Sequence, residues 1–250
     1  MINNFSKIRI VNAGDREMEG KVLKKLLERK CENVEVSISL DADRKGMWHN
    51  FKNAINVEDE GNWLIALEDD VSFPVDVLQR MDYILDFAPK DAWIFFYVPT
   101  NKAMKEAFNS GKKVNKSRYN YWSQCVCIPK TSRNHFIETI DDIWPPENIG
   151  GDSRTKKYME VNQKEAFTIL PSLFQHLGTW RSSAGYAGKI GENVRQSFCY
   201  DPNFDVYSVD WKKEFETPFK DKTPKGLIGF DGWKPNDKLD KWNKLNGMRL

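Results

Sequence analysis

The spacing of hydrophobic positions predicts strands that alternate with helices along the first hundred residues. Short runs rich in β-branched or apolar residues favour strands at positions 7–12, 34–40, 63–67 and 92–98. Between these runs, apolar residues recur every three or four positions, which predicts helices through Met18, through Trp48 and after Pro74, with Pro74 in the first turn. We therefore expect an α/β fold with a mostly parallel central sheet flanked by helices.

The pattern is weaker in the second half of the chain. A strand is expected at 124–128 and a helix at 133–143, and a helix-like stretch runs from Ser153 onward. From about Gly185, glycine, proline, aspartate, lysine and tryptophan mix without a clear period, which predicts loops and short elements. We expect one main domain over residues 1–190 and an extension over 191–250 that packs on the same domain.

Composition limits the kinds of protein that this chain can be. At 250 residues with 40% hydrophobic content, it can bury a sizeable core, and a formal charge of +2 names no polyanionic partner. Four cysteines are too few for a disulfide framework, and Cys125-x-Cys127 lacks the second pair of a zinc site, so buried thiols are expected. No signal segment and no run of about 18 apolar residues occurs, so we expect a cytoplasmic protein without a membrane span.

The stretch LIALEDDVSF brings three adjacent acids, Glu68, Asp69 and Asp70, to the end of a buried strand. Ligands of open α/β sheets bind beyond the carboxyl ends of the strands. Adjacent carboxylates repel one another, and their cost beside apolar residues is offset by water, basic side chains or a cation. Oxygen ligands of this kind suit Mg²⁺ or Mn²⁺. The alternative is a solvated turn whose acids cap the next helix.

With its surroundings, the acidic stretch resembles the front half of a GT-A glycosyltransferase, in which an acidic motif, usually Asp-x-Asp, anchors the metal of a nucleotide sugar. Arg44-x-Gly46 and a helix with Asn50 and Ala54 precede the motif, and Glu68 stands where the first Asp usually does. The form LEDDV is similar to that of lipopolysaccharide-type transferases and of N-glycan-branching N-acetylglucosaminyltransferases.

A second resemblance lies at residues 171–178, PSLFQHLG, which are followed by Ser182-Ser183. The branching transferases carry a very similar Pro-Ser-Leu-x-Gln-His-x-Gly segment, and many GT-A enzymes use a late histidine as a metal ligand. The resemblance therefore implies a metal-binding role for His176. The other histidines, His49 and His135, lie in helix-like segments and are expected to be structural. Together the two matches cover roughly residues 7 to 185.

The resemblance implies a metal-dependent glycosyltransferase that moves a sugar from a nucleotide sugar, with a UDP-sugar as the expected donor, to a hydroxyl acceptor. Mn²⁺ or Mg²⁺ would be held by Asp70 first and His176 second, with Glu68 on the ribose or on a metal-bound water. The donor-binding residues would be Asn12, Arg16, Asp43, Arg44, Glu68 and Asp69. Ordinary helix-surface charges are the alternative reading of Arg16 and Arg44.

If the reaction inverts the anomeric carbon, the acceptor hydroxyl needs a general base. Asp152 is the candidate, because it follows Gly150-Gly151 and precedes a helix-like stretch, a position that resembles that of the Asp or Glu base of many inverting GT-A enzymes. A helix N-cap is the alternative role for Asp152. Asp141 and Asp142 fit less well, because they lie within a helical pattern. In a retaining reaction, Asp152 would only position the substrate.

The acceptor is suggested by residues 101–118, which carry five lysines and one arginine against the single acid Glu106. Tyr119, Tyr121 and Trp122 follow, and a basic segment beside aromatic rings can hold a phosphate backbone and stack on a displaced base. A solvated loop is the alternative. Two acceptors stay open: a glycan or lipid-linked glycan, and hydroxymethylated DNA of a virus such as a phage, which would place the enzyme in the host cytoplasm.

Two further readings also stand. A non-catalytic GT-A-like module would bind a nucleotide or a glycan without transferring a sugar, and a metal-dependent nucleotidyltransferase would use carboxylates and Mg²⁺ for phosphoryl chemistry. The sequence shows no second pair of acids spaced for a two-metal site, and the Gln175-His176 segment favours sugar transfer. Arg181–Ser183 and Gly185–Gly191 are either a mobile flap over the diphosphate or a surface loop. The oligomeric state is left open.

Overall fold

The computed structural model describes residues 2–31, 33–98, 102–117, 124–143, 151–177 and 196–220, with only the backbone of residues 151–153. The strands are β1 (Lys7–Asn12), β2 (Glu35–Leu40), β3 (Trp63–Glu68), β4 (Val71–Ser72), β5 (Trp93–Phe95), β6 (Val114–Ser117), β7 (Cys125–Pro129), β8 (Ala166–Ile169), β9 (Gln175–His176) and β10 (Phe219–Lys220). The helices are α1 (Glu17–Glu28), α2 (Met47–Ile55), α3 (Val77–Leu85), α4 (Lys102–Asn109), α5 (Lys130–Ile143), α6 (Gly151–Val161) and α7 (Trp211–Glu216), with a 3-10 turn at Val206–Ser208.

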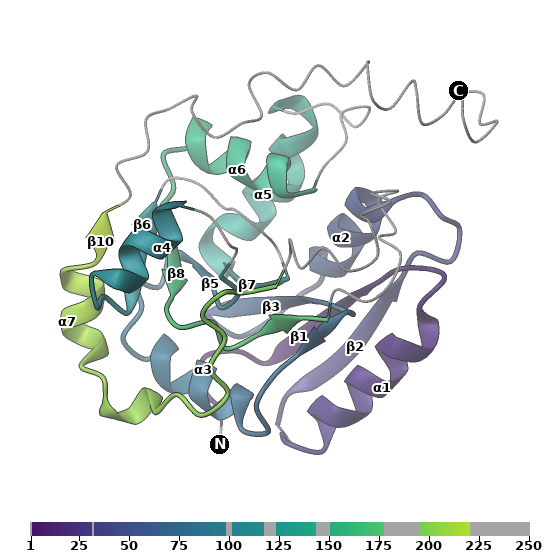
Figure 1. The fold of residues 1–250 in the computed structure, drawn as a ribbon. Helices are drawn as coiled ribbons and strands as arrows, with labels where there is room; N and C mark the ends of the chain where they lie inside the picture. Colours follow the sequence, from purple (N-terminus) through teal and green to yellow (C-terminus); the bar gives the residue numbers. More distant parts are fainter. Residues whose placement is uncertain are drawn as a thin grey trace, which may run out of the picture.

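Eight of these strands form one central sheet in the order β10-β6-β8-β5-β7-β3-β1-β2 (Figure 1). The run β2-β1-β3 is parallel, as are the pairs β5-β8 and β6-β10. Strand β7 runs antiparallel to both of its neighbours, and β6 runs antiparallel to β8. The sheet is therefore mixed, with parallel pairs in the majority, as the alternation of strands and helices predicted. The remaining strands, β4 and β9, form a separate antiparallel pair.

Helices cover both faces of the central sheet (Figure 1). Side chains of α1, α3 and α7 pack on one face, and side chains of α2, α5 and α6 pack on the other. Strand β3 shows how the sequence serves both layers: Trp63, Ile65 and Leu67 enter the first cluster, while Leu64 and Ala66 enter the second. A continuous apolar run of this kind is typical of a strand buried on both faces, and it confirms the central position expected for β3.

The predicted elements are largely confirmed, with three differences. Pro74 lies before α3, which begins at Val77, because residues 75 and 76 form a turn first. The expected strand at 92–98 is regular only in β5, although the residues after it remain buried. In α1, Leu23 is buried but Met18 is 68% exposed, so only part of the apolar pattern faces the core. The elements α4, β6 and β8 were not predicted.

The described part of the C-terminal extension packs on the central sheet. Residues 196–220 include α7, whose Trp211 is fully buried and whose Phe215 ring lies 5.6 Å from that of Phe167 in β8. Strand β10 then joins β6 at the edge of the central sheet. The proposed boundary at residue 190 lies outside the described residues. None of the helices in the described ranges is long and apolar enough to span a bilayer.

The cysteines behave as their small number predicted. Cys31, Cys125, Cys127 and Cys199 are free and buried. Burial raises the pKa of the thiols of Cys125 and Cys127 well above the ordinary value, which keeps both in the neutral form. Both lie in β7, at its start and at its middle, and belong to the core.

Candidate metal site

The middle acid, Asp69, is a buried brace between two strand ends. Its Oδ2 accepts hydrogen bonds from Asn12 Nδ2 at 2.5 Å and from the backbone N–H of Ala13 at 2.9 Å. These bonds tie the end of β3 to the end of β1. Burial raises the pKa of Asp69 to about 6, although Arg16 and the Ala13 N–H act in the opposite direction. Asp69 therefore supports the site from inside the fold.

Arg16, just before α1, is the basic side chain that compensates the acids. Its Nη2 lies 2.8 Å from Asp69 Oδ1, and its Nη1 donates to Asp70 Oδ2 at 2.6 Å. Burial disfavours the charged guanidinium, but the two carboxylates outweigh this and raise the pKa of Arg16. The residue was predicted to bind the donor or to be a surface charge. It is neither exposed nor free, because the acids engage it within the protein.

Glu68, Asp70 and His176 form the candidate metal site. One possible ligand atom from each lies within 4.8 Å of the other two. Asp70 and His176 meet because β4 pairs with β9, so that Val71 lies opposite His176 and the Leu177 N–H donates to the Asp70 carbonyl at 2.8 Å. The two residues predicted as metal ligands are thus brought together, with Glu68 beside them.

The donor chemistry of this group fits a divalent cation. His176 is only 4% exposed, and its Nε2 lies 3.2 Å from Asp70 Oδ2. Asp70 Oδ1 and both ring nitrogens of His176 are buried without a well-formed hydrogen bond to any described residue. Such atoms are costly unless something compensates them, and two carboxylates with one imidazole suit Mn²⁺ better than Mg²⁺, which prefers oxygen ligands.

The charge state of Asp70 also favours cation binding. Burial alone would raise its pKa, but the close approach of the His176 ring, together with Arg16, outweighs burial and lowers the pKa well below the ordinary value. Asp70 is therefore ionised at neutral pH, as a ligand of a hard cation has to be.

Glu68 has a neighbour that the sequence analysis did not single out. Gln124 Nε2 donates to Glu68 Oε2 at 3.3 Å, and the Glu68 N–H donates to the Gln124 carbonyl at 2.9 Å. Gln124 precedes β7, and nothing in its local sequence distinguishes it from the start of an ordinary strand. Its role depends on the antiparallel register of β3 and β7, which is a long-range property.

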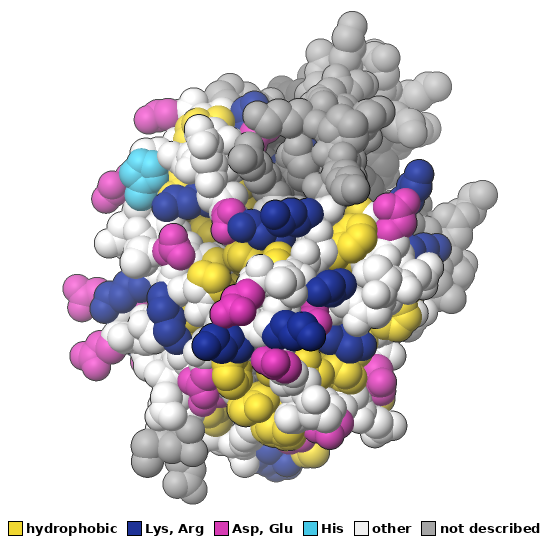
Figure 2. All heavy atoms as spheres, turned by 90° about the vertical axis from the view of Figure 1, so that its left-hand side faces the viewer, with side chains coloured by type: hydrophobic (Ala, Val, Ile, Leu, Met, Phe, Trp, Pro, Cys, Tyr) yellow, Lys and Arg dark blue, Asp and Glu magenta, His cyan; other side chains and the backbone are white. Residues whose placement is uncertain are grey.

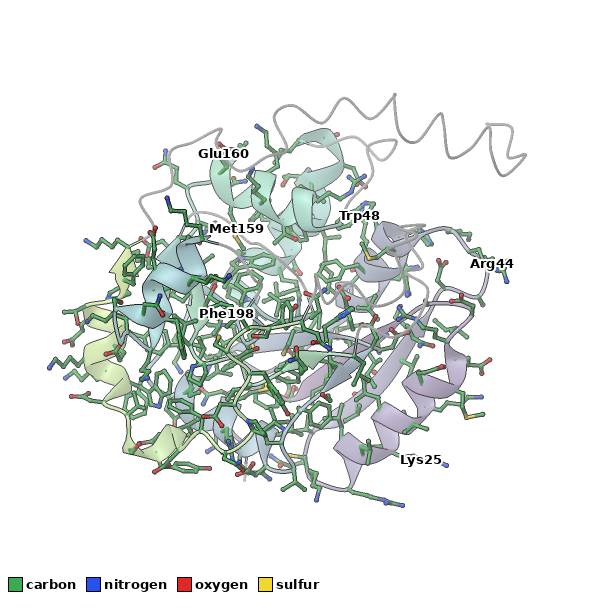
Figure 3. All side chains as sticks on the ribbon, viewed as in Figure 1. Lys25, Arg44, Trp48, Met159, Glu160 and Phe198 are labelled. Carbon is green, nitrogen blue, oxygen red and sulfur yellow. The ribbon has the colours of Figure 1, made fainter. Side chains whose placement is uncertain are left out.

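The other predicted donor residues lie farther from the acids or are already engaged. Asn12 is fully buried, and its side-chain nitrogen donates to Asp69 and to the Arg16 carbonyl. Asp43 is exposed and pairs with Lys45 at 3.3 Å. Arg44, with a φ of 54°, lies in the exposed loop between β2 and α2, and Figure 3 shows it at the edge of the molecule. Contact between these residues and a nucleotide stays a prediction.

The candidate bases are distinguished by their surroundings. Asp152 is in the first turn of α6, which begins at Gly151, two residues before the expected start at Ser153, and its side chain lies outside the described residues. Asp141 accepts from Trp48 Nε1 at 2.9 Å and from Lys52 Nζ at 2.5 Å, and its carboxylate lies 3.6 Å from Arg154. Asp141 thus joins α5 to α2 and α6, which is a structural role. Asp142 is exposed.

The histidines expected to be structural have contacts of that kind. His49 is exposed and lies 3.0 Å from Asn53 on the same helix, and His135 lies 3.0 Å from the Tyr158 hydroxyl, which joins α5 to α6. Several other predicted features lie outside the described residues: Tyr119, Tyr121, Trp122, Gly150, Gly178 and the possible flap at 181–191.

Comparison with known proteins gives no relative on which a function can be based. No family model matches the chain, and no curated protein matches it. A function for this chain is therefore inferred from the chemistry of the described residues, above all from the group formed by Glu68, Asp70 and His176.

Proposed function

We propose that the protein is a metal-dependent glycosyltransferase of the GT-A type, which moves a sugar from a nucleotide sugar to a hydroxyl acceptor. The observation that carries the proposal is the meeting of Glu68, Asp70 and His176 beyond the carboxyl end of β3. Ligands of open α/β sheets bind at this edge. The mixed, mostly parallel sheet is compatible with a GT-A fold. The LEDDV segment contains Glu68 and Asp70, and the PSLFQHLG segment contains His176.

Charge compensation is the main task of such a site. The bond between the sugar and the diphosphate breaks with negative charge building up on the leaving group. A divalent ion held by Asp70, His176 and Glu68 would supply Lewis-acid stabilisation of that charge. In the protein itself, Arg16 provides a second positive group within 3 Å of Asp69 and Asp70. Asn12 and Asp69 keep the strand ends in register, which fixes where these charges lie.

Asp152 is the proposed general base. In an inverting reaction, this carboxylate would take the proton of the acceptor hydroxyl as the oxygen attacks the anomeric carbon. Its position in the first turn of α6 supports this role, since a helix N-terminus holds a carboxylate in its ionised form. The acceptor is a glycan, a lipid-linked glycan or hydroxymethylated DNA.

A nucleotidyltransferase receives less support. Among the residues that the structure describes, Glu68, Asp70 and His176 are the one group of three or more potential ligands that converge. Two-metal phosphoryl chemistry needs ions about 4 Å apart with their own carboxylates. One cluster with a histidine fits the single ion of a sugar transferase better.

The test is nucleotide release from a panel of nucleotide sugars, in Mn²⁺ or in EDTA, with hydroxymethylated DNA, plain DNA, a glycan or no acceptor. We expect release that requires Mn²⁺ and is lost in Asp70→Asn but kept in Asp142→Asn, which removes an exposed acid elsewhere. Asp152→Asn should lose transfer while donor binding persists. Metal-dependent nucleotide binding without release from any donor would instead favour the non-catalytic module. Release of diphosphate from a nucleoside triphosphate would favour the nucleotidyltransferase.

A further inference from the structure

A pocket of about 380 Å³ is lined by residues other than Glu68, Asp69 and Asp70. Its volume is within the range of about 300–1,000 Å³ that small-ligand sites occupy. The residues that line it are Phe108, Lys113, Pro171, Phe198, Cys199, Tyr200, Asp201 and Phe204. Four of these eight side chains are aromatic, and one is a lysine of the basic segment at 101–118. The pocket thus joins that segment to aromatic residues almost one hundred positions later.

The aromatic wall is formed by α4 and by the chain at 196–204. Phe108, at the end of α4, is 38% exposed, and its ring meets the Phe198 ring edge to face with the centroids 5.6 Å apart. Phe198 and Phe204 are half-buried. Arg80 Nη1 donates to the carbonyls of Pro202 and Phe204, which holds this wall against α3. The rings are therefore partly accessible yet fixed in place.

Two lysines beside these rings have no carboxylate partner among the described residues. Lys105 Nζ lies 6.0 Å from the Phe198 ring centroid, and Lys113 Nζ lies 5.4 Å from that of Phe204. The neighbouring Lys116, by contrast, pairs with Glu165. Figure 2 shows that acidic and basic side chains are interspersed on the side of the molecule that carries α4 and α7. Any attraction for an anion therefore comes from these two lysines, and Asp201 is the one acid among the described residues that line the pocket.

The pocket is connected to the candidate metal site through a short stretch of chain. Pro171 lines the pocket, and His176 follows five residues later. Gln175, beside His176, fixes the aromatic segment: its Oε1 accepts from the Ser197 N–H at 2.7 Å, and its Nε2 donates to the Ser197 carbonyl at 3.3 Å. Ser172 also forms an isolated parallel β-bridge with Tyr200. A ligand in the pocket would thus lie on the segment that presents His176.

We propose that this pocket binds one nucleotide of a nucleic-acid acceptor, with the base against the aromatic rings and the phosphate beside Lys105 and Lys113. Aromatic rings next to unpaired cations are the usual means of holding a single strand. A neutral glycan also stacks on aromatic rings, but it gives the two lysines nothing to bind. The inference rests on the proposed glycosyl transfer for its biological meaning, since it selects nucleic acid among the open acceptors.

The test is binding of a fluorescein-labelled single-stranded oligothymidylate, measured by anisotropy in EDTA so that no metal contributes. We expect Phe108→Ala to weaken binding by about 5- to 100-fold, the usual effect of removing one stacking ring. Lys105→Gln and Lys113→Gln should each lower the salt dependence of log K by about 0.7. Lys25→Gln is the matched control, because Lys25, like Lys105, is an exposed lysine and lies on α1, well away from Phe198 (Figure 3).

The outcomes separate this inference from the proposed function. Phe108 is partly exposed, so Phe108→Ala should keep the melting temperature of the wild type within a few degrees. Failure of the wild type to bind, equal binding by Phe108→Ala, or displacement of the strand by a neutral oligosaccharide would each overturn the pocket assignment. Mn²⁺-dependent binding of a nucleotide sugar, measured on the same proteins, tests glycosyl transfer separately, because it should depend on Asp70 and be unchanged in Phe108→Ala.

Discussion

Asp70 Oδ2 and His176 Nε2 lie 3.2 Å apart, although more than one hundred positions separate the two residues along the chain. The pairing of β4 with β9 brings them together, and the same carboxylate oxygen also accepts from Arg16. One oxygen of Asp70 thus serves two cationic or potentially cationic groups, while the other is buried without a hydrogen bond to a described residue. The first two predictions concern the replacement of His176 and of Arg16, the two residues that contact this carboxylate.

Replacing His176 should remove metal affinity. We expect His176→Asn to bind Mn²⁺ at least about tenfold more weakly than the wild type, since even the loss of a residue that only orients a ligand has an effect of this size. Electron paramagnetic resonance of free Mn²⁺ measures the change directly. His49→Asn is the control, because His49 is exposed and its ring lies beside Asn53, its neighbour on the same helix. Equal affinity in both variants would exclude His176 as a ligand.

Replacing Arg16 should destabilise the protein and make it more dependent on metal. Arg16→Gln leaves Asp69 and Asp70 without their positive partner, and breaking a buried ion pair typically costs about 3–5 kcal/mol of unfolding free energy. Added Mn²⁺ should therefore raise the melting temperature of this variant more than that of the wild type. Arg29→Gln, at an exposed position after α1, should behave like the wild type. An equal Mn²⁺ shift in all three proteins would contradict the prediction.

Replacing Gly20 of α1 with alanine should lower the stability of the protein. A Cβ added there would lie 2.7 Å from Cγ of Asn12, a fully buried side chain that bonds Asp69. Crowding of this kind costs about 1–3 kcal/mol, which exceeds the gain of up to about 1 kcal/mol in helix propensity. We expect Gly20→Ala to be less stable in urea and to bind Mn²⁺ more weakly. Lys25→Ala, on the exposed side of α1, isolates the propensity effect and should be neutral or stabilising.

The ionised carboxylate of Asp141 should stabilise the folded protein at neutral pH and lose this effect in acid. Partial burial opposes its ionisation, but hydrogen bonds from Lys52 and Trp48 outweigh burial and lower the pKa in the folded state. A carboxyl group whose pKa is lowered by folding makes its full contribution to the unfolding free energy above its unfolded-state pKa of about 3.9. This contribution is lost as the pH falls through the folded-state pKa. Because the side chain is 31% exposed, solvent limits the effect to about 1 kcal/mol.

Urea unfolding of Asp141→Asn at two pH values checks this sign. The variant should be less stable than the wild type by about 1 kcal/mol at pH 7, and the difference should shrink as the pH falls below about 3.9. Asp142→Asn, one residue along and exposed, should differ from the wild type at neither pH. A deficit of Asp141→Asn that is the same at both pH values would show that its charge is not the cause.

Much of the fold follows from local pattern. The apolar run at 63–67 predicted the strand β3, and the apolar spacing after Pro74 predicted the helix α3, because both patterns depend only on residue spacing. Strand β6 was missed for the opposite reason. Val114–Ser117 is mostly polar in composition, and it forms a strand because β8 and β10 offer it backbone partners.

The sequence predicted the candidate metal ligands of the site, but not the residues that hold these ligands in place. Asp70 and His176 were named because their sequence segments resemble a family, and the structure places them in contact. The brace of Asn12 on Asp69 and the pairing of Arg16 with both acids depend on how the ends of β1 and β3 align in space. No spacing within the sequence encodes that alignment, so the same residues were assigned to the donor instead.

The two-stranded sheet of β4 and β9 makes the site a reporter of complete folding. Glu68 and Asp70 belong to the first third of the chain and His176 to the last third, so their ligand atoms meet only after the intervening strands have paired. Contacts between such distant segments form late, because the chain first has to lose the entropy of closing a long loop. A partly folded or truncated chain should therefore retain helices and yet have no affinity for Mn²⁺. Metal binding would then count native molecules in a preparation, independently of any enzymatic assay.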